Sequence, residues 1–148
     1  MDKMPTYKDL QVVENEYSNR DYEINIAIPE FNCVCPRTKL PDFATIHINY
    51  MPGKLIIELK SLKLYIVKFR LIGIFHEHVT NKILDDITRA CNPKSIEVVG
   101  DFKPRGGIKT SVVAKNEKLV VKTASPCPIF SAMRGISNAS VPDAHVTH

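Results

Sequence analysis

Apolar and polar residues alternate at residues 22–28, the pattern of a β-strand with one buried face, and Pro29 ends it. A second strand is predicted at residues 43–51, which are rich in β-branched and aromatic side chains. Pro52-Gly53 marks a turn, and residues 55–58 predict a third strand. The second and third strands are therefore expected to form a hairpin.

The spacing of apolar residues changes after residue 60. Between positions 62 and 69 they recur every three or four residues, as on one face of a helix, and Ser61 is the expected N-cap. A second helix is predicted over residues 79–90, where the apolar side chains share one face. Asn92-Pro93 ends it, because proline cannot continue a helix.

Two further strands are predicted at residues 95–102 and 108–114, joined by a turn at 104–107. The predicted elements are therefore one strand, followed by the series strand, strand, helix, helix, strand, strand. This order predicts an α+β fold in which both helices cover one face of an antiparallel sheet. We expect residues 1–20 to be an N-terminal lead and residues 21–115 to be the folded domain. Residues 116–148 form an expected tail, mobile or dependent on a partner, since periodicity disappears beyond about Lys122.

Length and charge narrow the possible functions. A chain of 148 residues is a comfortable size for one domain. The net charge of +4 permits an anionic ligand, but the lysines are scattered, so no direct nucleic-acid binding is expected. The N-terminus has no apolar run typical of a signal peptide, and charges interrupt the apolar residues 62–74. We therefore expect no membrane association and a cytoplasmic protein.

In a reducing cytosol, the four cysteines should be free thiols. They are Cys33, Cys35, Cys91 and Cys127. Cys35 is followed seven residues later by Asp42, which could take the proton of a nucleophilic thiol if the intervening loop folds back. On spacing alone, a buried structural cysteine and a strand-capping aspartate are the commoner arrangement.

The sequence predicts no metal site. Cys33 and Cys35 form a C-x-C pair, but no second ligand pair stands at zinc-site spacing. Residues 76–78 read His-Glu-His, yet the H-E-x-x-H motif would need histidine where Thr80 stands. Glu77 has two interpretations. Its negative charge stabilises the N-terminus of the second helix through the helix dipole, or its carboxylate accepts two N–H donors from a guanine-like edge.

Two groups of residues are candidates for phosphate binding. Lys60 and Lys63 lie near the start of the first helix, although a solvated lysine face is the commoner outcome. Arg105, in the Arg-Gly-Gly turn, is placed where glycines allow a close backbone approach. The sequence contains no G-x-G-x-x-G or P-loop motif.

Together, these features resemble the 7-cyano-7-deazaguanine reductases, the nitrile reductases of queuosine biosynthesis. Four stretches spanning roughly residues 21 to 115 carry the resemblance. They are Cys35-Pro36-Arg37-Thr38 continuing to residues 41–46, residues 58–65, Phe75-His76-Glu77, and residues 100–108.

The resemblance implies the tunnelling fold shared with GTP cyclohydrolase, in which subunits assemble side by side into a barrel with sites between subunits. By its length the chain looks like the single-module form of the family. The implied catalytic residues are Cys35 as nucleophile and Asp42 as proton shuttle. The implied substrate-binding residues are Ile57, Glu58, Leu59, His76 and Glu77. Lys60, Ser61 and Lys63 fall in the family's cofactor signature, and with Arg105 they are the expected cofactor-binding residues.

The implied reaction reduces the nitrile of 7-cyano-7-deazaguanine to a primary amine with two NADPH, through a cysteine thioimide, in a homo-oligomer. Three alternatives stay open. An archaeosine-type transferase would add ammonia to the same thioimide, although such relatives lack the cofactor signature. A zinc-dependent pterin or purine hydrolase would hold a metal, and a binding module would form no covalent adduct. The sequence leaves open the number of subunits, the preference for NADPH over NADH and the role of residues 116–148.

Overall fold

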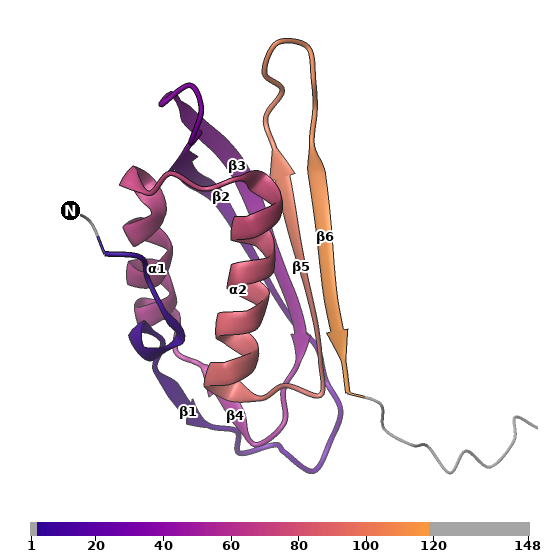
Figure 1. The fold of residues 1–148 in the computed structure, drawn as a ribbon. Coiled ribbons are helices and arrows are strands. Elements are labelled where there is room, and N and C mark those ends of the chain that lie inside the picture. Colours follow the sequence, from indigo (N-terminus) through magenta and orange to yellow (C-terminus); the bar gives the residue numbers. More distant parts are fainter. Residues whose placement is uncertain (1–2, 119–148) are drawn as a thin grey trace, which may run out of the picture. The chain divides into compact units, whose positions relative to one another are not determined.

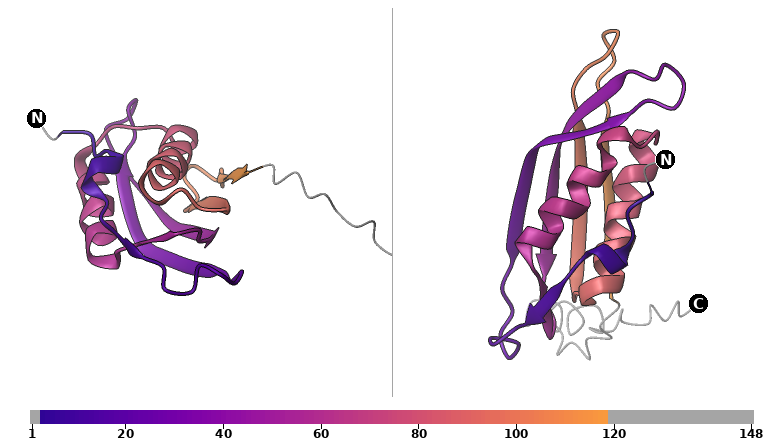
Figure 2. Two further views of the ribbon diagram at one scale, coloured as in Figure 1. Left: turned by 90° about the horizontal axis from the view of Figure 1, so that it is seen from below. Right: turned by 90° about the vertical axis from the view of Figure 1, so that its left-hand side faces the viewer.

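A four-stranded antiparallel sheet with two helices on one face forms the molecule (Figures 1 and 2). The structure, a computed structural model, describes residues 3–118; Cys127 and most of the predicted tail lie outside them. The strand order is β2-β3-β5-β6. These strands are β2 (Ile24–Val34), β3 (Pro41–Met51), β5 (Ser95–Phe102) and β6 (Ser111–Glu117). The helices are α1 (Leu59–Val67) and α2 (His76–Cys91), which confirms the α+β prediction.

The core lies between the sheet and the helices. Every second residue of β3 and β5 faces it, because strand side chains alternate between the two faces. α2 adds a stripe of fully buried side chains at three- and four-residue spacing. Each fully buried aliphatic or aromatic side chain stabilises the fold by about 1.5–3 kcal/mol. The buried apolar residues of these elements are Ala44, Ile46, Ile48, Tyr50, Ile96, Val98, Phe102, Val79, Ile83, Leu84, Ile87 and Cys91.

The predicted hairpin of the second and third strands is wrong. β4 (Leu55–Ile57) pairs instead with β1 (Val12–Glu14) in a separate two-stranded antiparallel sheet. β3 has no edge left for β4, because β2 and β5 occupy its two sides. Asn15 ties the small sheet to the turn, since its side-chain amide donates to the carbonyl of Gly53 at 2.8 Å. The N-terminal lead thus contributes β1, preceded by a short 3₁₀ helix at Tyr7–Asp9.

β2 is longer than predicted and includes Cys33. The register with β3 shifts between Ile28 and Phe31, at Pro29, which has no N–H for the ladder. Beyond this bulge the strand continues to Val34, and Phe31 and Cys33 are buried. The stretch expected to be a loop from residue 30 is therefore largely strand.

The helix and hairpin boundaries also differ from those expected. α1 begins at Leu59, three residues early, because the Glu58 carboxylate accepts the backbone N–H groups of Lys60 and Ser61, each at 2.7 Å. Glu58 rather than Ser61 is thus the N-cap. β6 begins at Ser111, since a wide turn precedes it in which Gly106 and Gly107 have φ of 58° and 78°. Positive φ favours glycine, which explains the Gly-Gly pair.

Candidate active site

Three segments meet at one end of the sheet, the upper end in Figure 1: the loop between β2 and β3, the start of α2, and the turn between β5 and β6. Between them lies an open cavity of about 470 Å³. Five of the predicted site residues line it, together with four residues not predicted from spacing. The lining is Cys35, Pro36, Thr38, Asp42, Phe75, His76, Glu77, Arg105 and Gly106.

Backbone hydrogen bonds close the loop that presents Cys35. The Cys35 N–H donates to the carbonyl of Leu40, and the Lys39 N–H donates to the carbonyl of Cys35, both at 2.9 Å. Lys39 adopts φ of 62°, which turns the chain back toward β3. The segment between Cys35 and Asp42 is thereby folded into a tight turn. A loop that folds back in this way is what the transfer of the Cys35 proton to Asp42 requires.

The three described cysteines differ in their chemistry. Hydrogen bonds from the side chain and backbone of Thr38 lower the pKa of the Cys35 thiol below its ordinary value. Cys33 is fully buried, and burial raises its thiol pKa to about 12. Burial likewise raises the thiol pKa of Cys91 to about 12. Cys35 is therefore the described cysteine with most thiolate character.

Asp42 is buried in β3, and each of its two carboxylate oxygens contacts a nitrogen of another side chain. His76 Nε2 lies 3.1 Å from its Oδ2. Arg105 Nη1 donates to its Oδ1, and Arg105 Nη2 lies 3.4 Å from Thr38 Oγ1. Only 3% of Asp42 is exposed, so these partners replace the water that the carboxylate loses.

A stacked aromatic pair fixes the plane of His76. Its imidazole lies parallel to the buried ring of Phe102, with centroids 3.7 Å apart and an interplanar angle of 7°. Thr80 Oγ1 donates to the His76 carbonyl at 2.8 Å. Gly100 leaves room for both supports, because a Cβ there would lie 2.5 Å from Thr80 Oγ1 and 2.8 Å from the Phe102 ring. Sequence reasoning found His76 but assigned no role to the three residues that support it.

Glu77 lies in the first turn of α2 and is exposed at the rim of the cavity. Its position there fits both readings of the sequence. The acidic group lies near the positive end of the helix dipole, and its carboxylate is free to accept donors from a ligand.

The other predicted residues lie elsewhere. α1 begins at the lower end in Figure 1, opposite the Cys35 cavity. Ile57 is buried and donates its N–H to Tyr50 Oη at 3.1 Å. Ser61 is buried too, and its Oγ accepts from the Gln11 N–H at 2.9 Å. One copy of the chain therefore does not bring residues 57–63 to Cys35.

Two exposed members of this second group line a separate groove. Leu59 and Lys63 border a hollow of about 280 Å³ between α1 and the outer strand β2. Lys60 and Lys63 are exposed, and neither forms an ion pair with a residue in the range 3–118. Arg105, predicted with these lysines, lies instead in the Cys35 cavity.

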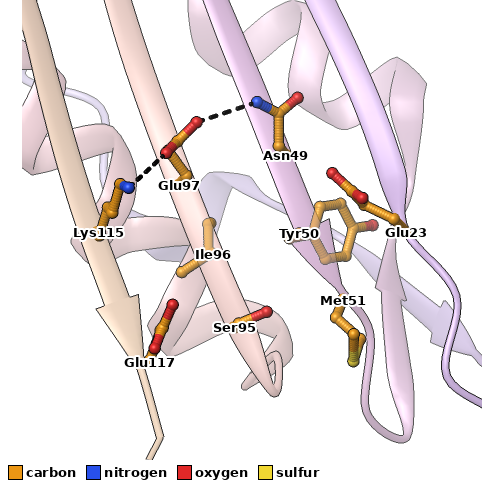
Figure 3. Close-up of a pocket in the computed structure, with 9 residues that line it drawn as sticks. All are labelled: Glu23, Asn49, Tyr50, Met51, Ser95, Ile96, Glu97, Lys115 and Glu117. Atoms are coloured by element: carbon orange, nitrogen blue, oxygen red, sulfur yellow. Dashed lines mark hydrogen bonds and ion pairs between the residues drawn. The ribbon is translucent and has the colours of Figure 1, made fainter.

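A further hollow of about 260 Å³ lies at the lower end of the sheet and contains none of the predicted residues (Figure 3). Three of its polar side chains contact one another, since Glu97 lies 3.4 Å from Asn49 and 3.2 Å from Lys115. Among residues 3–118 we find no group of three or more side chains placed to hold a metal ion. The helices in that range are too short or too polar to cross a membrane.

Known proteins are similar to this chain in sequence and in fold. Residues 41–120 match the family model described as QueF-like protein. The NADPH-dependent 7-cyano-7-deazaguanine reductase of Elusimicrobium minutum is 54% identical over 110 residues, which are 74% of this chain and 83% of that protein. The protein of the same name from Chloroherpeton thalassium is 56% identical over 108 residues, 73% of this chain and 93% of that protein.

The chain belongs to the family of NADPH-dependent 7-cyano-7-deazaguanine reductases. The fold agrees with this family assignment. An archaeosine synthase QueF-Like, crystallised in the apo form, superposes with a TM-score of 0.58 and covers 67% of this chain and 95% of that one. Its 21% identity makes this a likeness of fold. The resemblance found from four short stretches of sequence is thereby confirmed.

Proposed function

We propose that this protein reduces the nitrile of 7-cyano-7-deazaguanine to a primary amine with two NADPH, in the biosynthesis of queuosine in tRNA. Membership of the reductase family supports the reaction. The observation that carries the chemistry is that Cys35, with its lowered thiol pKa, shares one cavity with the buried carboxylate of Asp42. A free-thiol nucleophile also favours a reducing compartment, so we propose a cytoplasmic location.

Cys35 and Asp42 carry the first step. The Cys35 sulfur adds to the nitrile carbon, so a sulfur–carbon bond forms while the carbon–nitrogen triple bond becomes a double bond. The thiol proton passes through Asp42 to the nitrile nitrogen, which gives a neutral thioimide. Asp42 suits this role because a carboxylate has about four lone-pair sites, and two donors leave room for a third.

NADPH, when bound, supplies the hydride for each of two reduction steps, since a nitrile needs four electrons to become an amine. Cys35 leaves as the sulfur–carbon bond breaks after the first reduction, and the second reduces the resulting imine. Lys60 and Lys63 fit the cofactor phosphates, because their ammonium groups are exposed and form no ion pair with a described residue. Ser61 is expected to position them from within the helix.

Glu77 and His76 hold the deazaguanine ring in this proposal. The exposed Glu77 carboxylate can accept two N–H groups from the amino-pyrimidine edge of the ring. His76 already faces the cavity from the same helix turn, which keeps the nitrile end of the substrate near Cys35.

We further propose a homo-oligomeric barrel in which a second copy completes the site. In one copy, β4 ends at Ile57 and α1 begins at Leu59, at the lower end in Figure 1, opposite the β2–β3 loop that carries Cys35. The outer strands β2 and β6 each have one edge without a partner among the described strands, which suits strand pairing between copies. Glu58 caps its own helix, yet each of its oxygens can accept a further bond from a substrate held by another subunit. Such a closed site would protect the imine from water.

Intact-protein mass spectrometry after incubation with the nitrile, without NADPH, tests the nucleophile. We expect one adduct with the mass of one substrate, absent in Cys35→Ala and retained in the matched control Cys33→Ala. Binding of the deazaguanine without an adduct would favour a binding module. An adduct that is consumed by ammonia, with no use of NADPH, would favour the archaeosine-type transferase.

A further inference from the structure

Arg105 was predicted to meet a cofactor phosphate, yet its guanidinium points into the nucleophile's surroundings. Nη1 donates to Asp42 Oδ1, and Nη2 lies 3.4 Å from Thr38 Oγ1. The arginine side chain is 35% exposed, whereas that of Asp42 is 4% exposed. One arginine therefore contacts both the proton acceptor and the residue whose hydrogen bonds act on the Cys35 thiol.

Burial removes the Asp42 carboxylate from water. A carboxylate removed from water is costly unless a positive group is paired with it. The rigid, always charged guanidinium is well suited to that pairing, because its N–H groups are fixed in one plane. His76 contacts the other oxygen, so the carboxylate cannot rotate away from the cavity without losing both partners.

Arg105 and the nucleophile line the same cavity. The hydrogen bond from Arg105 to Asp42 is the main cause that raises the pKa of the guanidinium, so Arg105 keeps its positive charge in this cavity. A cation beside the sulfur favours the thiolate, the form that attacks the nitrile.

We propose that Arg105 is a positioning residue for thioimide formation: it holds the Asp42 carboxylate and the Thr38 hydroxyl in the orientation that serves the Cys35 thiol. This inference rests on the proposed function and adds a role in a step that needs no cofactor. The proton still travels from the thiol through Asp42 to the nitrile nitrogen, while Arg105 stays protonated throughout. Arg105 acts through Asp42 and Thr38, and no bond to it forms or breaks.

The test measures the rate of thioimide formation without NADPH, by mass spectrometry of quenched samples over a range of nitrile concentrations. In Arg105→Gln we expect the rate at saturating nitrile to fall roughly 10- to 100-fold, part of the 10²–10⁴-fold that a positioned proton acceptor contributes. The nitrile concentration for half-saturation should change less than about threefold, because Arg105 acts on the step and not on the ring. Arg105→Lys keeps the charge but loses the planar pair of donors, so it should recover part of the rate.

Arg37→Gln is the matched control, because Arg37 is exposed in the loop that carries Cys35 and forms no ion pair with Asp42, so its replacement removes one positive charge without touching that carboxylate. Equal slowing in Arg37→Gln would mean that only the general field matters, and would overturn the proposal. Unchanged thioimide formation in a folded Arg105→Gln, with weaker NADPH binding by fluorescence titration, would place Arg105 at the cofactor alone and would also overturn it. If Arg105→Gln fails to fold, Arg105→Lys replaces it in the test. Because this variant lacks the planar pair of donors, thioimide formation at the wild-type rate would also overturn the proposal. If the wild-type protein forms no adduct at all, the proposed function itself fails.

Discussion

Alkylation of the folded protein should be confined to Cys35 among the described cysteines. The contrast follows from the thiolate populations. At pH 7, a thiol with an ordinary pKa of about 8.5 is about 3% thiolate. Cys33 and Cys91, with pKa values of about 12, are thiolate to only about one part in 10⁵.

The intrinsic reactivity of the thiolates narrows this difference. The thiolate fraction of an ordinary thiol exceeds that of Cys33 or Cys91 about 3,000-fold. A more basic thiolate is a better nucleophile, however, and a Brønsted slope of 0.4–0.5 makes each Cys33 or Cys91 thiolate about 40-fold more reactive. A net preference of roughly 100-fold for the Cys35 thiol remains. Cys33 is fully buried and Cys91 is 1% exposed, so exclusion of the reagent widens it further.

The assay follows iodoacetamide labelling by peptide mapping in a Cys127→Ala background, because Cys127 lies outside the described residues. The Cys35 rate should also persist to lower pH than that of a free cysteine peptide, since the Cys35 pKa lies below the ordinary value and the thiolate is lost only as the pH falls through it. Labelling of Cys33 at a rate within a few-fold of Cys35, or a Cys35 midpoint at or above that of the peptide, would refute the reasoning.

Three further predictions concern packing and assembly. Gly100→Ala should lower the free energy of unfolding by about 1–3 kcal/mol in urea titrations, because its Cβ would overlap neighbouring atoms; an unchanged midpoint would contradict the tight packing. Phe102→Leu should slow thioimide formation while leaving the nitrile affinity nearly unchanged, because the ring stacked on His76 is lost; an equal loss of affinity would indicate a general structural role. Mixed oligomers of Cys35→Ala and Glu58→Gln, each inactive alone, should recover activity if each site takes one residue from each copy, and inactive mixtures would contradict a shared site.

The main elements of the fold were predictable from apolar spacing alone. β5 and α2 each pack one face on the core, so apolar residues recur in β5 at every second position and in α2 at every third or fourth position. This pattern is visible within each segment alone. The pairing of β4 was not predictable, because it depends on β1, more than 40 residues away, and on the competition between β4 and β5 for the edge of β3. The extension of β2 past Pro29 was missed because a bulge, rather than an end of the strand, absorbs the proline.

The site was predictable only in part. The resemblance supplied Cys35, Asp42, His76 and Glu77, and the structure brings these four into one cavity. No spacing rule links Arg105 to Asp42, since the contact joins a turn to a strand 63 residues earlier. The partner of His76 in the stacked pair comes from β5, and this too is set by sheet geometry rather than by any local pattern.

The most direct test of the central claim is the consumption of NADPH on mixing the protein with 7-cyano-7-deazaguanine, followed by absorbance beside Cys35→Ala. Our account predicts the loss of two NADPH for each nitrile reduced, and no loss in the variant. A wild-type protein that consumes no NADPH, or a Cys35→Ala variant that consumes it as fast as the wild type, would contradict the account.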